Sequence, residues 1–155
     1  FRSCDETDIG WNHQLAGRKC VYTPAAVAYH AHSGAAGSYS AFKGFHVERN
    51  RIYLCIKYFP LPDLILSGFY ATYRYLYQLY LSYSSKGALA QYRKNNSLGS
   101  GFILLLKAHL AVIKKFPVMW RRRCQFRNIR KLNRREFNRL FERFGISARG
   151  MAGYE

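Results

Sequence analysis

The chain has 155 residues, of which 49% are hydrophobic, and a formal net charge of +17. These values predict one folded domain of moderate size and exclude a disordered chain. No apolar run reaches the roughly 18–20 residues that a membrane-spanning helix needs. The four cysteines form no C-x-x-C pair, which argues against a zinc site and indicates reduced thiols in a cytosolic protein. Because the sequence begins at Phe1 rather than Met, we expect it to be part of a longer protein.

The first 40 residues contain one predicted helix, followed by extended runs. The helix covers residues 5–16, because acids suit the positive end of a helix dipole, apolar residues recur along it, and Gly17 follows it. Residues 19–22 predict a short strand and residues 26–30 a second extended run, with a proline between them. Residues 33–40 have the Gly/Ser-rich composition of a loop.

A boundary is predicted at the sequence FPLP, residues 59–62, which follows a predicted helix over residues 42–59. This boundary divides the chain into residues 1–60 and 61–155. The first part holds seven Lys/Arg against four acids, whereas residues 114–149 hold thirteen Lys/Arg against two acids. So uneven a charge distribution predicts that the two parts have different tasks.

The second part is predicted to be mostly helical. Residues 64–83 and 102–116 repeat apolar side chains at steps of three and four, and Pro117 is predicted to end the second of these helices. Residues 84–100 are mainly polar and contain SLGS, which predicts a linker. The last helix, residues 133–144, begins with the spacing of a capping box and stops before a glycine.

Three of the chain's eight acids, Asp5, Glu6 and Asp8, lie within four positions at the start of the first helix. One interpretation is structural, because acids complement the positive end of a helix dipole. The other is a general base or a metal-facing carboxylate beside a cleft, because neighbouring acids repel one another unless a cation or hydroxylated ligand compensates. His30 ends an extended run before the Gly/Ser loop, where a metal or phosphate contact competes with a structural role.

The order of these features is more specific than any one of them. The segment DETDIGWNHQLAGRKCVYTPAAVAYHAHS resembles the C-terminal half of the catalytic domain in inverting family 2 glycosyltransferases, above all the bacterial, rhamnosyltransferase-like members. The matching residues are Asp5, Glu6, Asp8, Ile9, Gly10, Trp11, Leu15, Ala16, Gly17, Pro24, Ala26 and His30, with the family's RN pair at Arg49 and Asn50. The resemblance implies an α/β fold: the C-terminal half of a GT-A domain, followed by an amphipathic, basic α-helical extension.

The resemblance also implies a role for several of these residues. Glu6, or Asp5 beside it, would be the general base that deprotonates the acceptor hydroxyl. Asp8 and Trp11 would bind the acceptor, although a tryptophan here is as well suited to a core. His30 would contact the divalent metal, Mg²⁺ or Mn²⁺, that bridges the diphosphate of the donor.

Three further features follow from the resemblance. Arg49 and Asn50 would contact the donor phosphates or hold the acceptor loop, with a simple inter-helix contact as the alternative. The acidic pair reads Asp-Glu where the family usually has Glu-Asp, which leaves the base open between the two, and Asn12 stands where the family usually has a basic residue. The family binds its nucleotide-sugar donor mainly through a preceding half that this chain lacks. We therefore expect no transfer to a glycan or lipid-linked acceptor by this chain alone.

The basic tail predicts a surface that meets anionic lipids. Arg121, Arg122 and Arg123 stand beside helices rich in Tyr and Leu, and each Lys or Arg near such a membrane contributes roughly 1 kcal/mol of attraction. This predicts a cytoplasmic protein, peripheral on the inner face of the cell membrane. No nucleic-acid module is recognisable, so no nucleic-acid partner is expected. The alternatives are helices that merely pack on the catalytic domain, and a non-catalytic basic module that binds anionic lipid or RNA.

Overall fold

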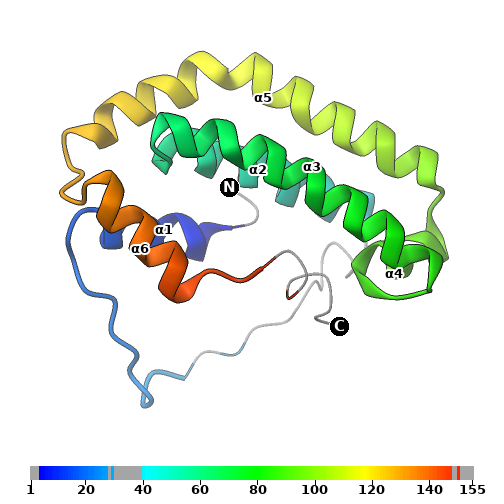
Figure 1. The fold of residues 1–155 in the computed structure, drawn as a ribbon, viewed down its shortest axis with the longest axis horizontal. Helices are drawn as coiled ribbons and strands as arrows, with labels where there is room; N and C mark the ends of the chain where they lie inside the picture. The colour runs from blue at the N-terminus through cyan, green and yellow to red at the C-terminus, as the bar shows by residue number, and fades with distance from the viewer. Residues whose placement is uncertain (1–3, 28, 30–39, 148–149, 151–155) are drawn as a thin grey trace.

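Six helices make up the structure, a computed structural model that describes residues 4–27, 29, 40–147 and 150 (Figure 1). They are α1 (Asp5–Leu15), α2 (Ala41–Tyr58), α3 (Leu61–Tyr83), α4 (Gly87–Asn95), α5 (Leu98–Arg127) and α6 (Arg134–Phe144). In Figure 1, α5 arches over α2 and α3, while α1 and α6 lie together at one end and α4 lies at the other. None of the described helices is long and apolar enough to cross a bilayer.

The predicted α/β fold is wrong, because the described residues contain no strand. Residues 19–22, predicted as a strand, are irregular, and the Val21 and Tyr22 side chains are exposed. A strand is stable only when the backbone of a neighbouring strand completes its hydrogen bonds, and the described part of the chain offers no such neighbour. The second extended run, residues 26–30, lies partly outside the described residues, and the loop at residues 33–40 lies almost entirely outside them.

Four predicted helices are confirmed as α1, α2, α3 and α6. The chain leaves α1 through Gly17, whose φ of 72° is a left-handed conformation that glycine adopts without strain. The predicted capping box of α6 is also confirmed. The Asn133 side chain accepts a hydrogen bond from the Glu136 backbone N–H. In return, the Glu136 side chain accepts a hydrogen bond from the Asn133 backbone N–H.

Two predictions in the second part are wrong. The supposed linker, residues 84–100, contains α4 and the first turn of α5. Pro117 does not end a helix but lies inside α5, where its ring removes one backbone hydrogen bond. The helix continues because Val112 and Met119, on either side of the proline, are both buried against α2. A proline inside a helix bends it, in keeping with the arch of α5 in Figure 1.

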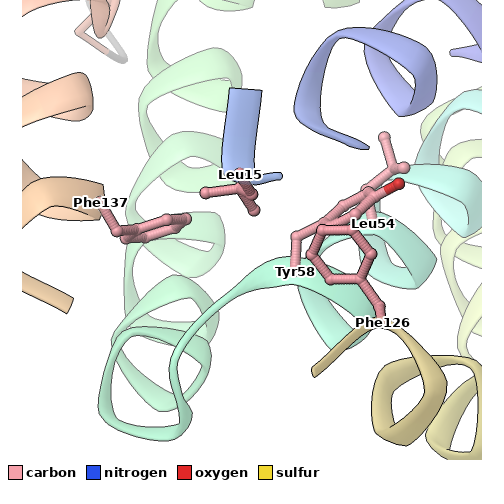
Figure 2. Packing of buried hydrophobic residues seen from close by; sticks show 5 residues of the cluster. All are labelled: Leu15, Leu54, Tyr58, Phe126 and Phe137. Atoms are coloured by element: carbon pink, nitrogen blue, oxygen red, sulfur yellow. The ribbon is translucent and has the colours of Figure 1, made fainter. Parts of the chain in front are cut away.

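The core is built around α2. One cluster joins α1, α2, α5 and α6 through Leu15, Leu54, Tyr58, Phe126 and Phe137, and Figure 2 shows these side chains converging. A second cluster joins α2 to α5 through Tyr53, Ile56, Val112 and Met119. The first cluster draws residues from both sides of the boundary predicted near residue 60.

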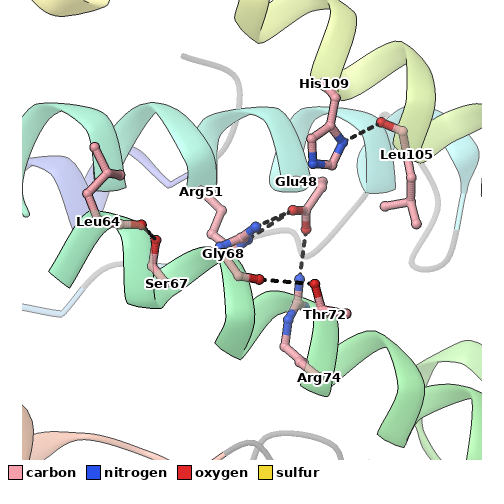
Figure 3. A network of polar contacts seen from close by, with 9 residues as sticks. All are labelled: Glu48, Arg51, Leu64, Ser67, Gly68, Thr72, Arg74, Leu105 and His109. Atoms are coloured by element: carbon pink, nitrogen blue, oxygen red, sulfur yellow. Dashed lines mark hydrogen bonds and ion pairs between the residues drawn. The ribbon is translucent and has the colours of Figure 1, made fainter. Parts of the chain in front are cut away.

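A buried carboxylate links α2 to α3 (Figure 3). Glu48 accepts hydrogen bonds from Arg51 Nε at 3.0 Å and Nη2 at 2.6 Å within α2, and from Arg74 Nη2 of α3 at 2.8 Å. Burial alone would raise the pKa of Glu48, but the hydrogen bonds and charges of the two arginines outweigh it and hold the pKa below its ordinary value. Burial and the neighbouring carboxylate of Glu48 also raise the pKa of Tyr75 to about 12.

Candidate functional site

The three acids of α1 have different surroundings. Asp5 and Glu6 are exposed in the first turn of the helix, whereas Asp8 is half-buried against α2. The Asp8 carboxylate accepts hydrogen bonds from Lys57 Nζ at 2.8 and 3.1 Å and from the Tyr58 hydroxyl at 2.7 Å. Burial and this hydrogen bond raise the pKa of Tyr58. Asp8 therefore fastens α1 to α2, while the exposed pair faces outward.

Trp11 packs in a group of aromatic rings between α1 and α6. Its ring stacks on Phe141, with a centroid distance of 5.2 Å and an interplanar angle of 26°, and lies 5.5 Å from the ring of Phe137 and 6.2 Å from that of Phe59. Three ring contacts give Trp11 a structural task at the α1–α6 contact. Part of the Trp11 side chain stays accessible, as its predicted contact to an acceptor requires.

A groove of about 300 Å³ runs along α1 and α6 beside Trp11. It is lined by Thr7, Gly10, Trp11, Gln14, Leu140, Phe141, Phe144 and Gly145. Glu6 is exposed and lies one helical turn before Gly10, which lines this groove. Aromatic faces beside an exposed carboxylate suit a hydroxylated ligand such as a sugar, which can stack its C–H face and donate a hydroxyl proton.

The predicted metal contact, His30, lies outside the described residues. Across the ranges that the structure describes, no three His, Cys, Asp or Glu side chains come together in a way that could hold a metal ion. The described residues therefore do not by themselves form the site that a divalent metal would need.

Arg49 and Asn50 form a fixed pair on α2. Asn50 is fully buried, and its Oδ1 accepts hydrogen bonds from Arg49 Nε at 3.1 Å and Nη2 at 3.0 Å. Nη2 also lies 3.0 Å from His46 Nδ1, and the guanidinium lies over the rings of Phe45 and Tyr53, at 5.3 and 5.7 Å from their centroids. These contacts hold the guanidinium in one orientation, which a predicted contact to phosphate requires.

The three arginines predicted to meet a membrane are placed differently from one another. Arg121 and Arg122 are exposed on α5, whereas Arg123 is half-buried. Arg123 Nη1 donates to the carbonyl oxygens of Ile56 at 2.6 Å and Phe59 at 2.7 Å, where it satisfies the C-terminal end of α2. Burial lowers the pKa of Arg123. Its structural role at the end of α2 was not apparent in the sequence.

The outward face of α3 is apolar and exposed, and only its apolar pattern could be predicted from the sequence. The side chains of Ile65, Leu66, Phe69, Leu76, Tyr80 and Tyr83 are all more than half exposed along this face. The only charged residues of α3 are Asp63 and Arg74, which form ion pairs with Arg134 of α6 and Glu48 of α2. The exposed face of α3 therefore carries no charge. The spacing of its apolar residues, at steps of three and four, could be predicted from the sequence, but the exposure of these residues could not.

No family model matches the chain, and neither a curated protein nor a solved structure matches it. The resemblance to family 2 glycosyltransferases therefore stays a proposal that rests on the residues and their order.

Proposed function

We propose that this chain is the acceptor-side part of an inverting glycosyltransferase that uses a nucleotide-diphosphate sugar in cell-surface polysaccharide synthesis. The single observation that supports the proposal best is the exposed Glu6, which lies one helical turn before Gly10 of the aromatic groove between α1 and α6. Asp8, three positions after Asp5, is held by Lys57 and Tyr58. Asp8 therefore holds the helix in place, whereas Glu6 is exposed beside the groove, where a ligand can reach it.

In the proposed reaction, Glu6 is the general base, with Asp5 as the alternative. The acceptor hydroxyl oxygen attacks the anomeric carbon of the donor sugar and gives its proton to the carboxylate. The bond from that carbon to the diphosphate oxygen breaks, and the nucleoside diphosphate leaves with the bonding electrons. Trp11 and the groove beside it would orient the acceptor. The divalent metal, with His30 as its contact, would neutralise charge on the leaving diphosphate.

The proposal is tested by a transfer assay on a protein that contains this chain together with a donor-binding half. In the double variant Asp5→Asn/Glu6→Gln, we expect transfer to be lost while the circular dichroism spectrum of the folded protein is unchanged. If transfer survives the double substitution, neither acid is the base, and the non-catalytic basic module becomes the better description.

Gly10 offers a test of the groove as the acceptor site. A Cβ added at Gly10 meets no other atom within 4 Å, so Gly10→Ala should raise the free energy of unfolding by about 0.5–1 kcal/mol, as alanine favours helix interiors. The added methyl group also narrows the groove, so we expect a higher KM for the acceptor. Gly68→Ala in α3 is the matched control, with equally open space. It should give the same gain in stability and an unchanged KM.

Association with the cytoplasmic surface of a membrane is the second part of the proposal, and the uncharged outward face of α3 supports it. Exposed aromatic and aliphatic side chains on one helix face suit the interface of a bilayer, and the high positive charge of the chain would attract anionic lipids. With Phe69 and Leu76 in the interface, the face would lie against the lipid and leave α2 and α5 in water.

Sedimentation with vesicles of phosphatidylcholine and phosphatidylglycerol tests this association. Phe69→Ser/Leu76→Ser is expected to weaken binding by at least about tenfold, because two large side chains would lose their apolar burial. Val21→Ser/Tyr22→Ser is the control, since these two side chains are even more exposed but lie outside α3. Equal losses in the two double variants would show that α3 has no special part in membrane binding.

A further inference from the structure

A second groove, of about 510 Å³, lies between α2 and α5. Four cationic side chains line it: Arg49 from α2, and Lys114, Lys115 and Arg122 from α5. Lys115 and Arg122 are seven residues apart, so they lie two turns from each other on the same side of the helix. All the lining residues belong to these two helices, and none of them is acidic.

The guanidinium group of Arg49 is preorganised at this groove. Its Nε and Nη2 are held by the buried Asn50 side chain, and its guanidinium lies over the ring of Tyr53, which also lines the groove. No hydrogen bond of Nη1 is found in the part of the chain that the structure describes. An arginine held in this way loses little side-chain entropy when it binds an anion.

Three acids of the helices α1, α2 and α3 are paired with cations outside this groove. Asp8 pairs with Lys57, Glu48 pairs with Arg51 and Arg74, and Asp63 pairs with Arg134. The four cations of the groove therefore gather without a carboxylate among its lining residues, although like charges repel one another. A bound anion would relieve this repulsion.

We propose that the groove between α2 and α5 binds a phosphate or diphosphate group, carried by a soluble phosphate ester or by a lipid head group. A planar guanidinium can hold two phosphate oxygens at once, and lysine ammonium groups add point charges around them. The volume of about 510 Å³ exceeds what one phosphate fills, and the space beside Tyr53 and Met119 would take the group to which the phosphate is attached. The proposal shares Arg49 with the predicted contact to the donor phosphates, but it uses neither Glu6 nor the outward face of α3, so loss of phosphate binding and loss of sugar transfer can be measured separately.

The test compares two double variants of the chain, Lys115→Gln/Arg122→Gln in the groove and Arg135→Gln/Arg139→Gln on α6. All four side chains are exposed, so both variants should fold, and each removes two positive charges. One arm of the test measures the binding of pyrophosphate to each variant by isothermal titration calorimetry. The other measures binding to vesicles of phosphatidylcholine with phosphatidic acid, and to vesicles of phosphatidylcholine alone.

We expect the groove variant to bind its ligand at least about tenfold more weakly than the unaltered chain, since it loses two charged groups that would bond to the phosphate oxygens. The α6 variant should change binding less than twofold. A loss confined to the pyrophosphate arm identifies a soluble phosphate ester, and a loss confined to phosphatidic acid vesicles identifies a lipid head group. Equal losses in both variants, or binding of neither probe by the unaltered chain, would overturn the proposal.

Discussion

Replacing Glu6 with Gln, in a protein that contains this chain and a donor-binding half, is expected to lower kcat of sugar transfer by about two to four orders of magnitude. The amide has nearly the shape of the carboxylate but cannot take a proton from the acceptor hydroxyl. Glu6 is exposed in the first turn of α1, so its replacement should leave the packing of α1 on α2 intact. The measurement is initial transfer rate at saturating donor and acceptor, with pH varied around neutrality.

Two variants on the same helix make this result interpretable. Asp5→Asn removes the neighbouring exposed carboxylate, and should lower kcat much less if Glu6 is the base. Asp8→Asn instead weakens the contact to Lys57 and Tyr58, so its main effect should be a loss of stability. If Asp5→Asn gives the large loss of kcat and Glu6→Gln the small one, the base is Asp5. Two small losses would contradict the proposed chemistry.

Glu48→Gln is expected to lower the free energy of unfolding by about 3 kcal/mol, near the lower end of the range for breaking a buried ion pair. The Glu48 side chain is only 7% exposed and pairs with Arg51 at 2.6 Å and with Arg74 at 2.8 Å. The amide would leave two arginines without a negative partner between α2 and α3. The measurement is denaturant-induced unfolding followed by circular dichroism.

Glu142→Gln is the matched control for this substitution, since Glu142 is exposed on α6. It should change the free energy of unfolding by less than about 0.5 kcal/mol. If Glu48→Gln is as mild as the control, the ion pair makes no net contribution and its arginines are well solvated without it.

The lowered pKa of Glu48 also predicts the pH dependence of stability. A carboxyl group whose pKa is lower in the folded than in the unfolded chain binds fewer protons when folded, so its contribution is complete above the unfolded value, near 4.5. The contribution is lost as the pH falls below that value through the folded pKa. Unfolding measured from pH 7 down to pH 3 should therefore show a steeper loss of stability for the unaltered chain than for Glu48→Gln.

Much of the helical structure could be predicted from the sequence because helix hydrogen bonds join residues four positions apart. The apolar steps of α3 and the capping box of α6 are local signals, and both predictions are confirmed. The α/β fold was wrong for the opposite reason. Residues 19–22 have strand-like composition, but a strand depends on a partner that local sequence does not supply. Pro117 was misjudged because long-range packing keeps α5 helical on both sides of it.

For the candidate site, too, the local features could be predicted from the sequence and the long-range contacts could not. The position of Asp5 and Glu6 at a helix start was predicted from the sequence, because dipole and composition signals are local. The attachment of Asp8 to Lys57 was not, since 49 residues separate the two. The basic groove was not predicted either, because Arg49 and Lys115 meet only when α2 lies along α5.

The sequence by itself determined the positive charge, the starts of α1, α2 and α6 and the uncharged, apolar face of α3, because each depends on composition or on neighbours within a few positions. Only the tertiary structure decided which acid holds α1 in place, which face of α3 is exposed and which cations gather in one groove. Side-chain contacts between distant segments depend on how whole helices pack, and that packing follows from the core around α2.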